Sequence, residues 1–209
     1  MRHQLQKDNN EIFRAGGAQE MTSSSKRIEN TLLIGKSGSG KTQWASELID
    51  QCSSCGYRVF IIDAGASYKD QARLLGGSYY NVALYEKAQP GFLQKFKGRT
   101  CTVFDLEDFR DALPKNKAAN SILEALSLHV LSSEAPCLVI LDEIWQYAGG
   151  DLRLVELYEA ISSNGGIVIT LLQAMSELDL CEKTAEVIRE NTPITLDFPV
   201  TAEQGGLAE

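Results

Sequence analysis

Short apolar runs alternate with longer stripes of apolar residues at helical spacing along most of the chain. Each run is almost continuously apolar, which is typical of strands buried on both faces of a parallel sheet. A weaker strand is expected near residues 79–82, within the least regular stretch of the chain, 64–100. The stronger strands are expected at 31–35, 58–63, 101–106, 137–143, 166–173 and 194–198.

Three amphipathic stripes lie between these runs. They predict helices around residues 44–52, 122–130 and 154–161. Asn116 or Ser121 is the expected N-terminal cap of the second helix, because either side chain can accept a hydrogen bond from the first turn. Strands that alternate with helices favour right-handed crossovers. We therefore predict an α/β fold of three layers, with helices on both faces of a mostly parallel sheet.

Length and composition limit the class of protein. The chain has 209 residues, of which 44% are hydrophobic, enough for one full core. No apolar stretch of the sequence reaches the roughly 20 residues that a membrane-spanning helix needs, and the polar start lacks a signal-peptide pattern, so we expect a cytoplasmic protein. The net charge of −8 argues against a broad basic surface, so direct contact with DNA has no support from charge and stays open.

Composition also divides the chain into three parts. Residues 1–29 are polar and without regular pattern, and we interpret them as an N-terminal arm. Residues 30–200 carry the alternating pattern and are expected to form the single domain, while 201–209 form a C-terminal tail.

A glycine-rich turn fits the phosphate-binding pattern G-x-x-x-x-G-K-[ST]. It follows a predicted strand and begins a predicted helix, which is the context that this P-loop pattern requires, and this argues against a merely flexible turn. Backbone N–H groups of such a loop point at the phosphates of ATP. Lys41 is expected to bridge the β- and γ-phosphates, and Thr42 to offer its hydroxyl to Mg²⁺. The residues of the turn are Gly35, Lys36, Ser37, Gly38, Ser39, Gly40, Lys41 and Thr42.

Acidic and amide side chains follow the later strands, at the edge of the sheet where ligands of open α/β sheets bind. Asp142 is expected to hold Mg²⁺, and Glu143 to act as the general base that activates water. Gln173 ends the next strand and is expected to orient the water beside the γ-phosphate. Asp63 and Asp105 also end strands; each could belong to the same rim or simply cap its strand.

Taken in order, these segments resemble the motor domain of the conjugative-transfer ATPases of type IV secretion systems, especially the F-plasmid-like branch. The resemblance covers about residues 30–198. Its most selective parts are the D-x-G-x-S-Y segment at 63–68 with the following LLGG, then FDLE and LDEIW. The segments that carry it are TLLIGKSGSGKT, GYRVFIIDAGASYKDQARLLGGSYYNV, CTVFDLED, LVILDEIWQYAGG, NGGIVITLLQ and IRENTPITLDF.

The resemblance implies a RecA-like sheet in which the strand carrying Gln173 lies between the P-loop strand and the strand carrying Asp142. It also implies ATP bound by Gly35 to Thr42, with Asp142, Glu143 and Gln173 in the roles given above. Members of that family assemble, usually as hexamers, at the cytoplasmic face of the inner membrane. There they work with other secretion-system subunits and use ATP to drive pilus assembly and substrate transfer.

Two departures from the family leave other functions open. Relatives carry a large N-terminal region and further C-terminal helices, so we expect either an excised motor core or a reduced relative. The segment 159–166, which is typically rich in Arg and Lys in the family, contains neither residue type here. Loss of an arginine supplied by a neighbouring subunit would lower turnover by about 10³-fold or more. A nucleotide-binding assembly subunit that does not hydrolyse ATP is therefore the first alternative.

The second alternative is a dimerising ATPase of the partition or septum-positioning kind. In those proteins a lysine directly after the first glycine of the loop reaches the nucleotide of the partner, and Lys36 occupies that position here. Ser37 in place of a glycine and the adjacent Asp142-Glu143 pair argue against this alternative, and a solvated lysine explains Lys36 equally well.

Overall fold

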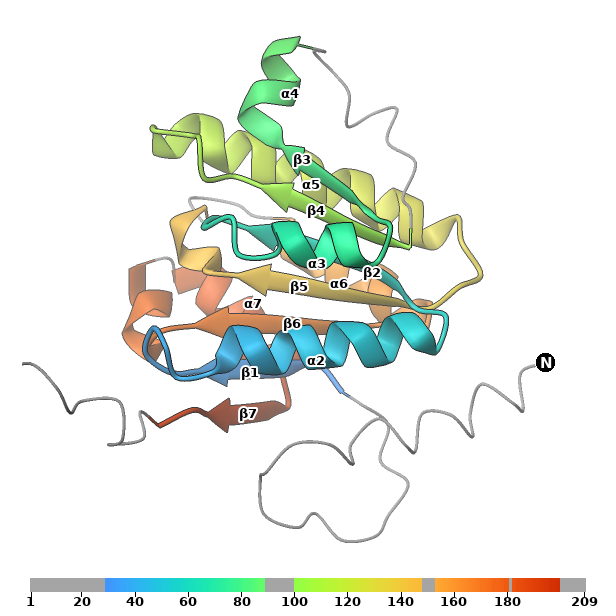
Figure 1. Cartoon of the computed structure of the whole chain (residues 1–209). Helices are drawn as coiled ribbons and strands as arrows, with labels where there is room; N and C mark the ends of the chain where they lie inside the picture. Colours follow the sequence, from blue (N-terminus) through green and yellow to red (C-terminus); the bar gives the residue numbers. More distant parts are fainter. Residues whose placement is uncertain (1–28, 89–99, 148–152, 181, 200–209) are drawn as a thin grey trace, which may run out of the picture.

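A computed structural model describes residues 29–88, 100–147, 153–180 and 182–199, and most of the expected arm and tail lie outside these residues. Seven parallel strands form one sheet in the order β3-β4-β2-β5-β6-β1-β7 (Figure 1). All the expected strands are confirmed, and the weak one is the edge strand β3. The strands are β1 (Thr31–Ile34), β2 (Arg58–Asp63), β3 (Ser78–Asn81), β4 (Cys101–Asp105), β5 (Cys137–Asp142), β6 (Ile167–Leu172) and β7 (Ile194–Asp197).

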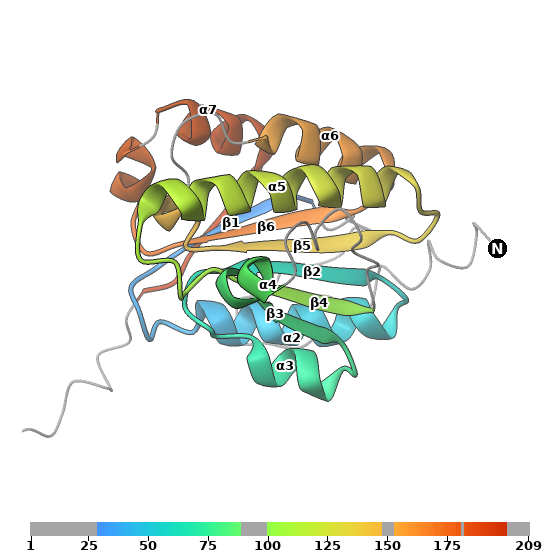
Figure 2. The same ribbon diagram turned by 90° about the horizontal axis from the view of Figure 1, so that it is seen from above.

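Helices cover both faces of the sheet, so the predicted three-layer α/β fold is confirmed. Figure 2 shows α5, α6 and α7 along one face, and α2 and α3 along the other. Two short 3₁₀ helices, η2 and η3, follow β5 and β6. The helices are α2 (Lys41–Ser54), α3 (Lys69–Leu74), α4 (Val82–Ala88), α5 (Ala112–Leu131), α6 (Leu154–Ser163), α7 (Glu182–Asn191), η2 (Ile144–Gln146) and η3 (Met175–Leu180).

The start of α5 differs from the prediction. The expected cap at Asn116 or Ser121 is wrong, because the helix already begins at Ala112 and Asp111 holds the N-cap position in an extended conformation. The first turn is exposed and carries no buried stripe, so periodicity could not reveal it. Pro114 fits this turn because the first N–H groups of a helix have no partner within the helix.

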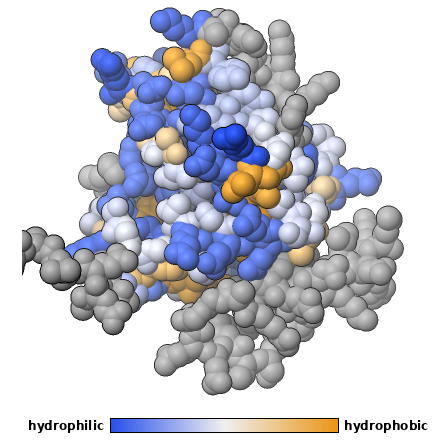
Figure 3. Space-filling view, viewed as in Figure 1, coloured by the Kyte–Doolittle hydropathy of each residue, from blue (hydrophilic) through white to orange (hydrophobic). Residues whose placement is uncertain are grey.

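The core consists of two apolar layers, one on each face of the sheet. In β2, Phe60 and Ile62 belong to the layer beneath α5 and α6, while Val59 and Ile61 belong to the layer beneath α2. This alternation explains why the strands are continuously apolar. The outer surface seen in Figure 3 is mostly hydrophilic, with small separate hydrophobic patches. In the part of the chain that the structure describes, no helix is both long and apolar enough to cross a bilayer.

The strand order brings the predicted chemistry to one edge. Strand β6 pairs with β1 on one side and with β5 on the other, which is the arrangement that the family resemblance implied. Ile34 pairs with Leu172, and Asp142 pairs with Leu171. Because all three strands are parallel, the residues that follow them emerge side by side at the carboxyl edge of the sheet.

Candidate nucleotide-binding site

A cavity of about 400 Å³ opens at the carboxyl edge of β1, β6 and β5. It brings together the P-loop and the three residues that follow the later strands, although the two groups lie about a hundred residues apart in sequence. Gly35, Lys36 and Ser39 do not line it directly. The predicted residues that do line it are Ser37, Gly38, Gly40, Lys41, Thr42, Asp142, Glu143 and Gln173.

The glycines of the P-loop are required by its shape. Gly38 and Gly40 have φ angles of 77° and 97°, in the left-handed region that favours glycine. A Cβ atom on Gly35 would lie 2.5 Å from the carbonyl oxygen of Phe198 and 2.6 Å from Oγ of Ser39. The loop is therefore a close-packed bend with fixed geometry, as a phosphate cradle requires.

Unpaired N–H groups at the start of α2 match a phosphate ligand. Helix α2 begins directly after Gly40, which provides no side-chain cap, and its first turn contains no acidic residue. Its first intrahelical bond runs from the N–H of Trp44 to the carbonyl of Gly40, so the preceding N–H groups, including that of Thr42, are available to an anion.

Lys41 carries the positive charge of the cavity. Its side chain is buried, and Nζ donates to the carbonyl oxygens of Gly35 and Lys36. These two bonds hold the ammonium group inside the loop. Among the described residues that line the cavity, Lys41 faces three carboxylates, those of Asp63, Asp142 and Glu143.

The two expected metal ligands lie at one hydroxyl group. The Tyr68 hydroxyl donates to Oδ2 of Asp142 over 2.9 Å. The side chain of Thr42 lies beside the same hydroxyl. Burial, and then the nearby charge of Asp63, raise the pKa of Asp142 to about 7. A cation beside Asp142 would offset this cost, and hard oxygen ligands such as these suit Mg²⁺.

Phosphate oxygens would have to complete such a metal site. In the described part of the chain, no group of three or more His, Cys, Asp or Glu side chains could hold a metal ion. This agrees with Mg²⁺, which is usually bound through one or two protein ligands together with substrate phosphates and water.

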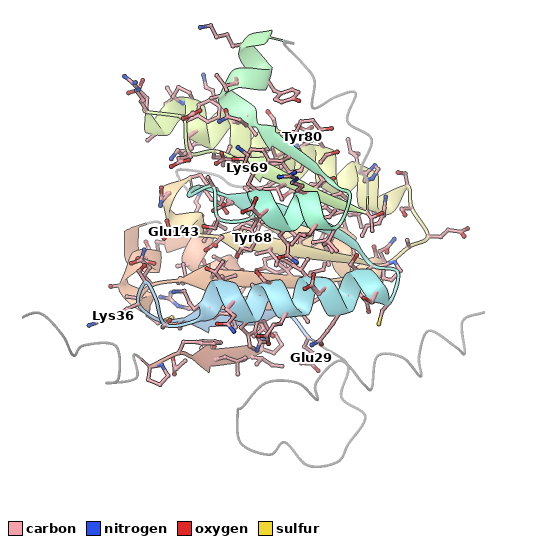
Figure 4. All side chains as sticks on the ribbon, viewed as in Figure 1. Glu29, Lys36, Tyr68, Lys69, Tyr80 and Glu143 are labelled. Atoms are coloured by element: carbon pink, nitrogen blue, oxygen red, sulfur yellow. The ribbon has the colours of Figure 1, made fainter. Side chains whose placement is uncertain are left out.

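The Glu143 carboxylate is held by two amides. Nε2 of Gln173 donates to Oε1 over 2.7 Å, and Nε2 of Gln146 donates to Oε2. Glu143 itself has a φ of 48°, which is uncommon for a residue other than glycine and is often found at functional positions. The structure thus brings Glu143 and Gln173 into direct contact. Figure 4 shows Glu143 on the side of the molecule toward which the strands of Figure 1 point.

The sequence left two roles open for Asp63 and Asp105, part of the rim of the site or cap of a strand, and the structure separates them. Asp63 lines the cavity and also accepts hydrogen bonds from the N–H groups of Gly65 and Ser67. Burial is the main cause that raises the pKa of Asp63. Asp105 does not line the cavity; it accepts from the N–H of Glu107 and the hydroxyl of Tyr79, so it caps its strand.

Sequence reasoning missed two residues that hydrogen-bond to predicted ones, Tyr68 and Gln146. It also missed four residues that line the cavity, Gln43, Gly65, Ser67 and Leu172. Tyr68 belongs to the selective D-x-G-x-S-Y segment, but its spacing gives no sign that it would reach the end of β5. Gln146 follows Glu143 by three residues, and only the 3₁₀ turn of η2 brings its amide back to the carboxylate.

The arginine-poor segment 159–166 lies at the end of α6 and before β6, at the amino edge of the sheet. The cavity lies at the opposite, carboxyl edge. An arginine in this segment would therefore lie far from the cavity of its own chain.

The sheet and this edge define a P-loop NTPase fold. Residues 17–115 match the family model described as the TraG P-loop domain, which confirms the resemblance to the conjugative-transfer ATPases. VirB4 of Thermoanaerobacter pseudethanolicus is a structural match with a TM-score of 0.65 and 14% identity, covering 92% of this chain and 81% of that chain.

A second solved structure shares the fold. The genome packaging NTPase B204 from Sulfolobus turreted icosahedral virus 2, in complex with ATP-γS, matches with a TM-score of 0.56 and 15% identity. The match covers 84% of this chain and 77% of that chain. A search of curated protein sequences found no match.

Proposed function

We propose that this chain binds ATP with Mg²⁺ and hydrolyses it as the motor core of a conjugation or type IV secretion system. Its turnover would power pilus assembly or substrate transfer. One observation carries the proposal: residues of the P-loop, Thr42 among them, line a single cavity with Asp142, Glu143 and Gln173. The family match over residues 17–115 and the VirB4-like fold support the assignment to this kind of system.

The P-loop binds the phosphates in this proposal. The N–H groups at the start of α2 have no partner within the helix and provide hydrogen-bond donors to the phosphates. Lys41 provides the charge that offsets the β- and γ-phosphates. Thr42 and Asp142 hold Mg²⁺, which when bound neutralises phosphate charge and helps to align the leaving group.

Glu143 and Gln173 serve the attacking water. Glu143 accepts the proton of the water as it attacks the γ-phosphate, and Gln173 orients the water and the carboxylate. Both side chains extend from adjacent strand ends, so neither needs a long movement to act. The hydrogen bond between them supports this division of roles.

Turnover in this proposal requires a neighbouring subunit. The described lining of the cavity contains three carboxylates and one ammonium group, so it offers little charge to stabilise a transition state on the γ-phosphate. We infer that a neighbouring subunit supplies an arginine, in a homo-oligomer, expected as a hexamer, or in a complex with other secretion subunits. Such an assembly is expected at the cytoplasmic face of the inner membrane, with residues 30–200 as the motor domain.

The same shortage of positive charge favours the alternative of an assembly subunit that binds ATP without hydrolysing it. Lys36, on which the partition-type alternative depends, is exposed and does not line the cavity; Figure 4 shows it on the periphery of the molecule. A lysine that reaches a partner and a solvated lysine would both be exposed and outside the cavity of their own chain, so the position of Lys36 does not distinguish the two accounts.

Steady-state ATP hydrolysis and ATP affinity, measured side by side over a range of protein concentrations, test the proposal. We expect specific activity to rise with concentration, in parallel with assembly seen by light scattering. Lys41→Ala should abolish nucleotide binding, since the phosphates lose the one cation in the described lining of the cavity. Tight binding without turnover at every concentration would instead identify an assembly subunit.

A further inference from the structure

The side chain of Tyr68 lies wholly inside the molecule, although it belongs to the loop between β2 and α3. It has no exposed surface, and its ring packs in the apolar layer beneath α2. Figure 4 shows it between α3 and the sheet. The packed ring fixes the place of the hydroxyl group, which is the one polar atom of this side chain.

That hydroxyl group holds one expected metal ligand and lies beside the other. It donates its hydrogen to Oδ2 of Asp142, which is only 5% exposed. The side chain of Thr42 lies beside the same hydroxyl. Asp142 ends β5, and Thr42 belongs to the first turn of α2, which follows β1. Because β6 lies between β1 and β5, the two ligands come from parts of the sheet that do not pair with each other.

We propose that Tyr68 is a positioning residue for the magnesium site, whose hydroxyl holds the carboxylate of Asp142 in place beside Thr42 to serve one ion. This inference rests on the proposed function, because it needs the ion to arrive with ATP. Tyr68 does not contact the nucleotide in this view; it acts through Asp142. Without the hydroxyl, the buried carboxylate of Asp142 would lose a donor and its freedom would increase.

A second tyrosine provides a matched control. Tyr79 on β3 donates its hydroxyl hydrogen to Oδ2 of Asp105 at the end of β4. The chemistry of this pair is the same, but neither Tyr79 nor Asp105 lines the cavity. Removing one hydroxyl from each site therefore separates an effect on the metal from a general effect of losing a tyrosine–aspartate bond.

Binding of a non-hydrolysable ATP analogue, measured by calorimetry in Mg²⁺ and in EDTA, tests the inference with the full chain. In the wild type we expect Mg²⁺ to increase the affinity. In Tyr68→Phe the increase in affinity caused by Mg²⁺ should be about tenfold smaller, because one hydrogen bond to a charged group is lost. The affinity of this variant in EDTA should equal that of the wild type. Tyr79→Phe should keep the full gain. Thermal melting verifies that each variant is folded.

Several outcomes distinguish the inference from the proposed function. A Tyr68→Phe variant with the full Mg²⁺ gain, or with equal losses in Mg²⁺ and in EDTA, would overturn the positioning role. In a double variant with Asp142→Asn, removal of the Tyr68 hydroxyl should have little further effect on the gain, and a full additional loss would also overturn it. Failure of the wild type to bind the analogue would contradict the proposed function instead.

Discussion

The side-chain amide of Gln173 donates a hydrogen bond of 2.7 Å to Oε1 of Glu143, joining the residue after β6 to the residue after β5. The second oxygen of Glu143 accepts from Gln146, so both oxygens of the expected base are occupied by amide donors. A carboxylate held in this way is oriented, and each oxygen keeps a lone pair that can accept a proton from water. Gln173 is the donor of the two that lines the cavity.

Replacement of Glu143 by glutamine should separate binding from chemistry. The amide would keep the shape of the side chain but could not accept a proton, so we expect Glu143→Gln to lower the rate of ATP hydrolysis by about 10²- to 10⁴-fold. Affinity for ATP should remain within about twofold, because the phosphates are held elsewhere. Equal losses of affinity and turnover would contradict the role of Glu143 as base.

Loss of Gln146 should leave Glu143 less well oriented. We expect Gln146→Ala to lower kcat by about tenfold with ATP affinity unchanged, since one charge-assisted hydrogen bond is lost. Gln71→Ala is the control, because the amide of Gln71 donates to Asp50 on the surface of the protein. A fall in affinity without a fall in kcat would show that Gln146 serves the nucleotide rather than Glu143.

The close packing at Gly35 makes a stability prediction. A methyl group there would overlap with the Phe198 carbonyl and with Oγ of Ser39, so Gly35→Ala should destabilise the protein by about 1–3 kcal/mol. Gly65→Ala should have a much smaller effect, because the nearest atom to its Cβ would be Oγ of Ser67 at 3.6 Å. Urea unfolding of both variants measures the difference, and similar unfolding midpoints would be inconsistent with the packing described.

Protonation of Asp142 should make the stability of the metal-free protein depend on pH. Its folded-state pKa is about 7 and its ordinary value is 3.8, so between these values the folded chain holds a proton that the unfolded chain has released. The free energy of unfolding in EDTA should therefore fall as pH rises through this window. Urea unfolding at about pH 5.5 and about pH 7.5 measures the fall. In Asp142→Asn the free energy of unfolding should fall less between these two pH values. An equal fall in the variant would show that other groups cause the pH dependence.

Sequence patterns predicted the parts of this protein that depend on continuous apolar runs. The strand ending in Asp142 and the strand ending in Leu172 are buried on both faces, so their composition alone identifies them. The P-loop could also be predicted from sequence. Its left-handed turns at Gly38 and Gly40 favour glycine, so the loop leaves a glycine pattern in the sequence. The family resemblance then supplied the order of β1, β6 and β5, which apolar runs alone do not encode.

Short and exposed elements could not be predicted in the same way. Helix α3 has one buried residue, Ala72, and therefore no apolar stripe. The contact between Tyr68 and Asp142 joins residues 74 positions apart, and it exists only because β2 and β5 are neighbours. The bond from Gln146 to Glu143 depends on the left-handed backbone of Glu143, which its residue type does not favour.

The central claim is that one magnesium ion, held between Thr42 and Asp142, binds ATP in the P-loop. A crystal structure of the protein with Mg²⁺ and a non-hydrolysable ATP analogue tests it most directly. We expect the phosphates within the loop from Gly35 to Thr42, and the ion contacting the Thr42 hydroxyl and, directly or through water, Asp142. A nucleotide bound elsewhere, or an ion that contacts neither side chain, would contradict the account.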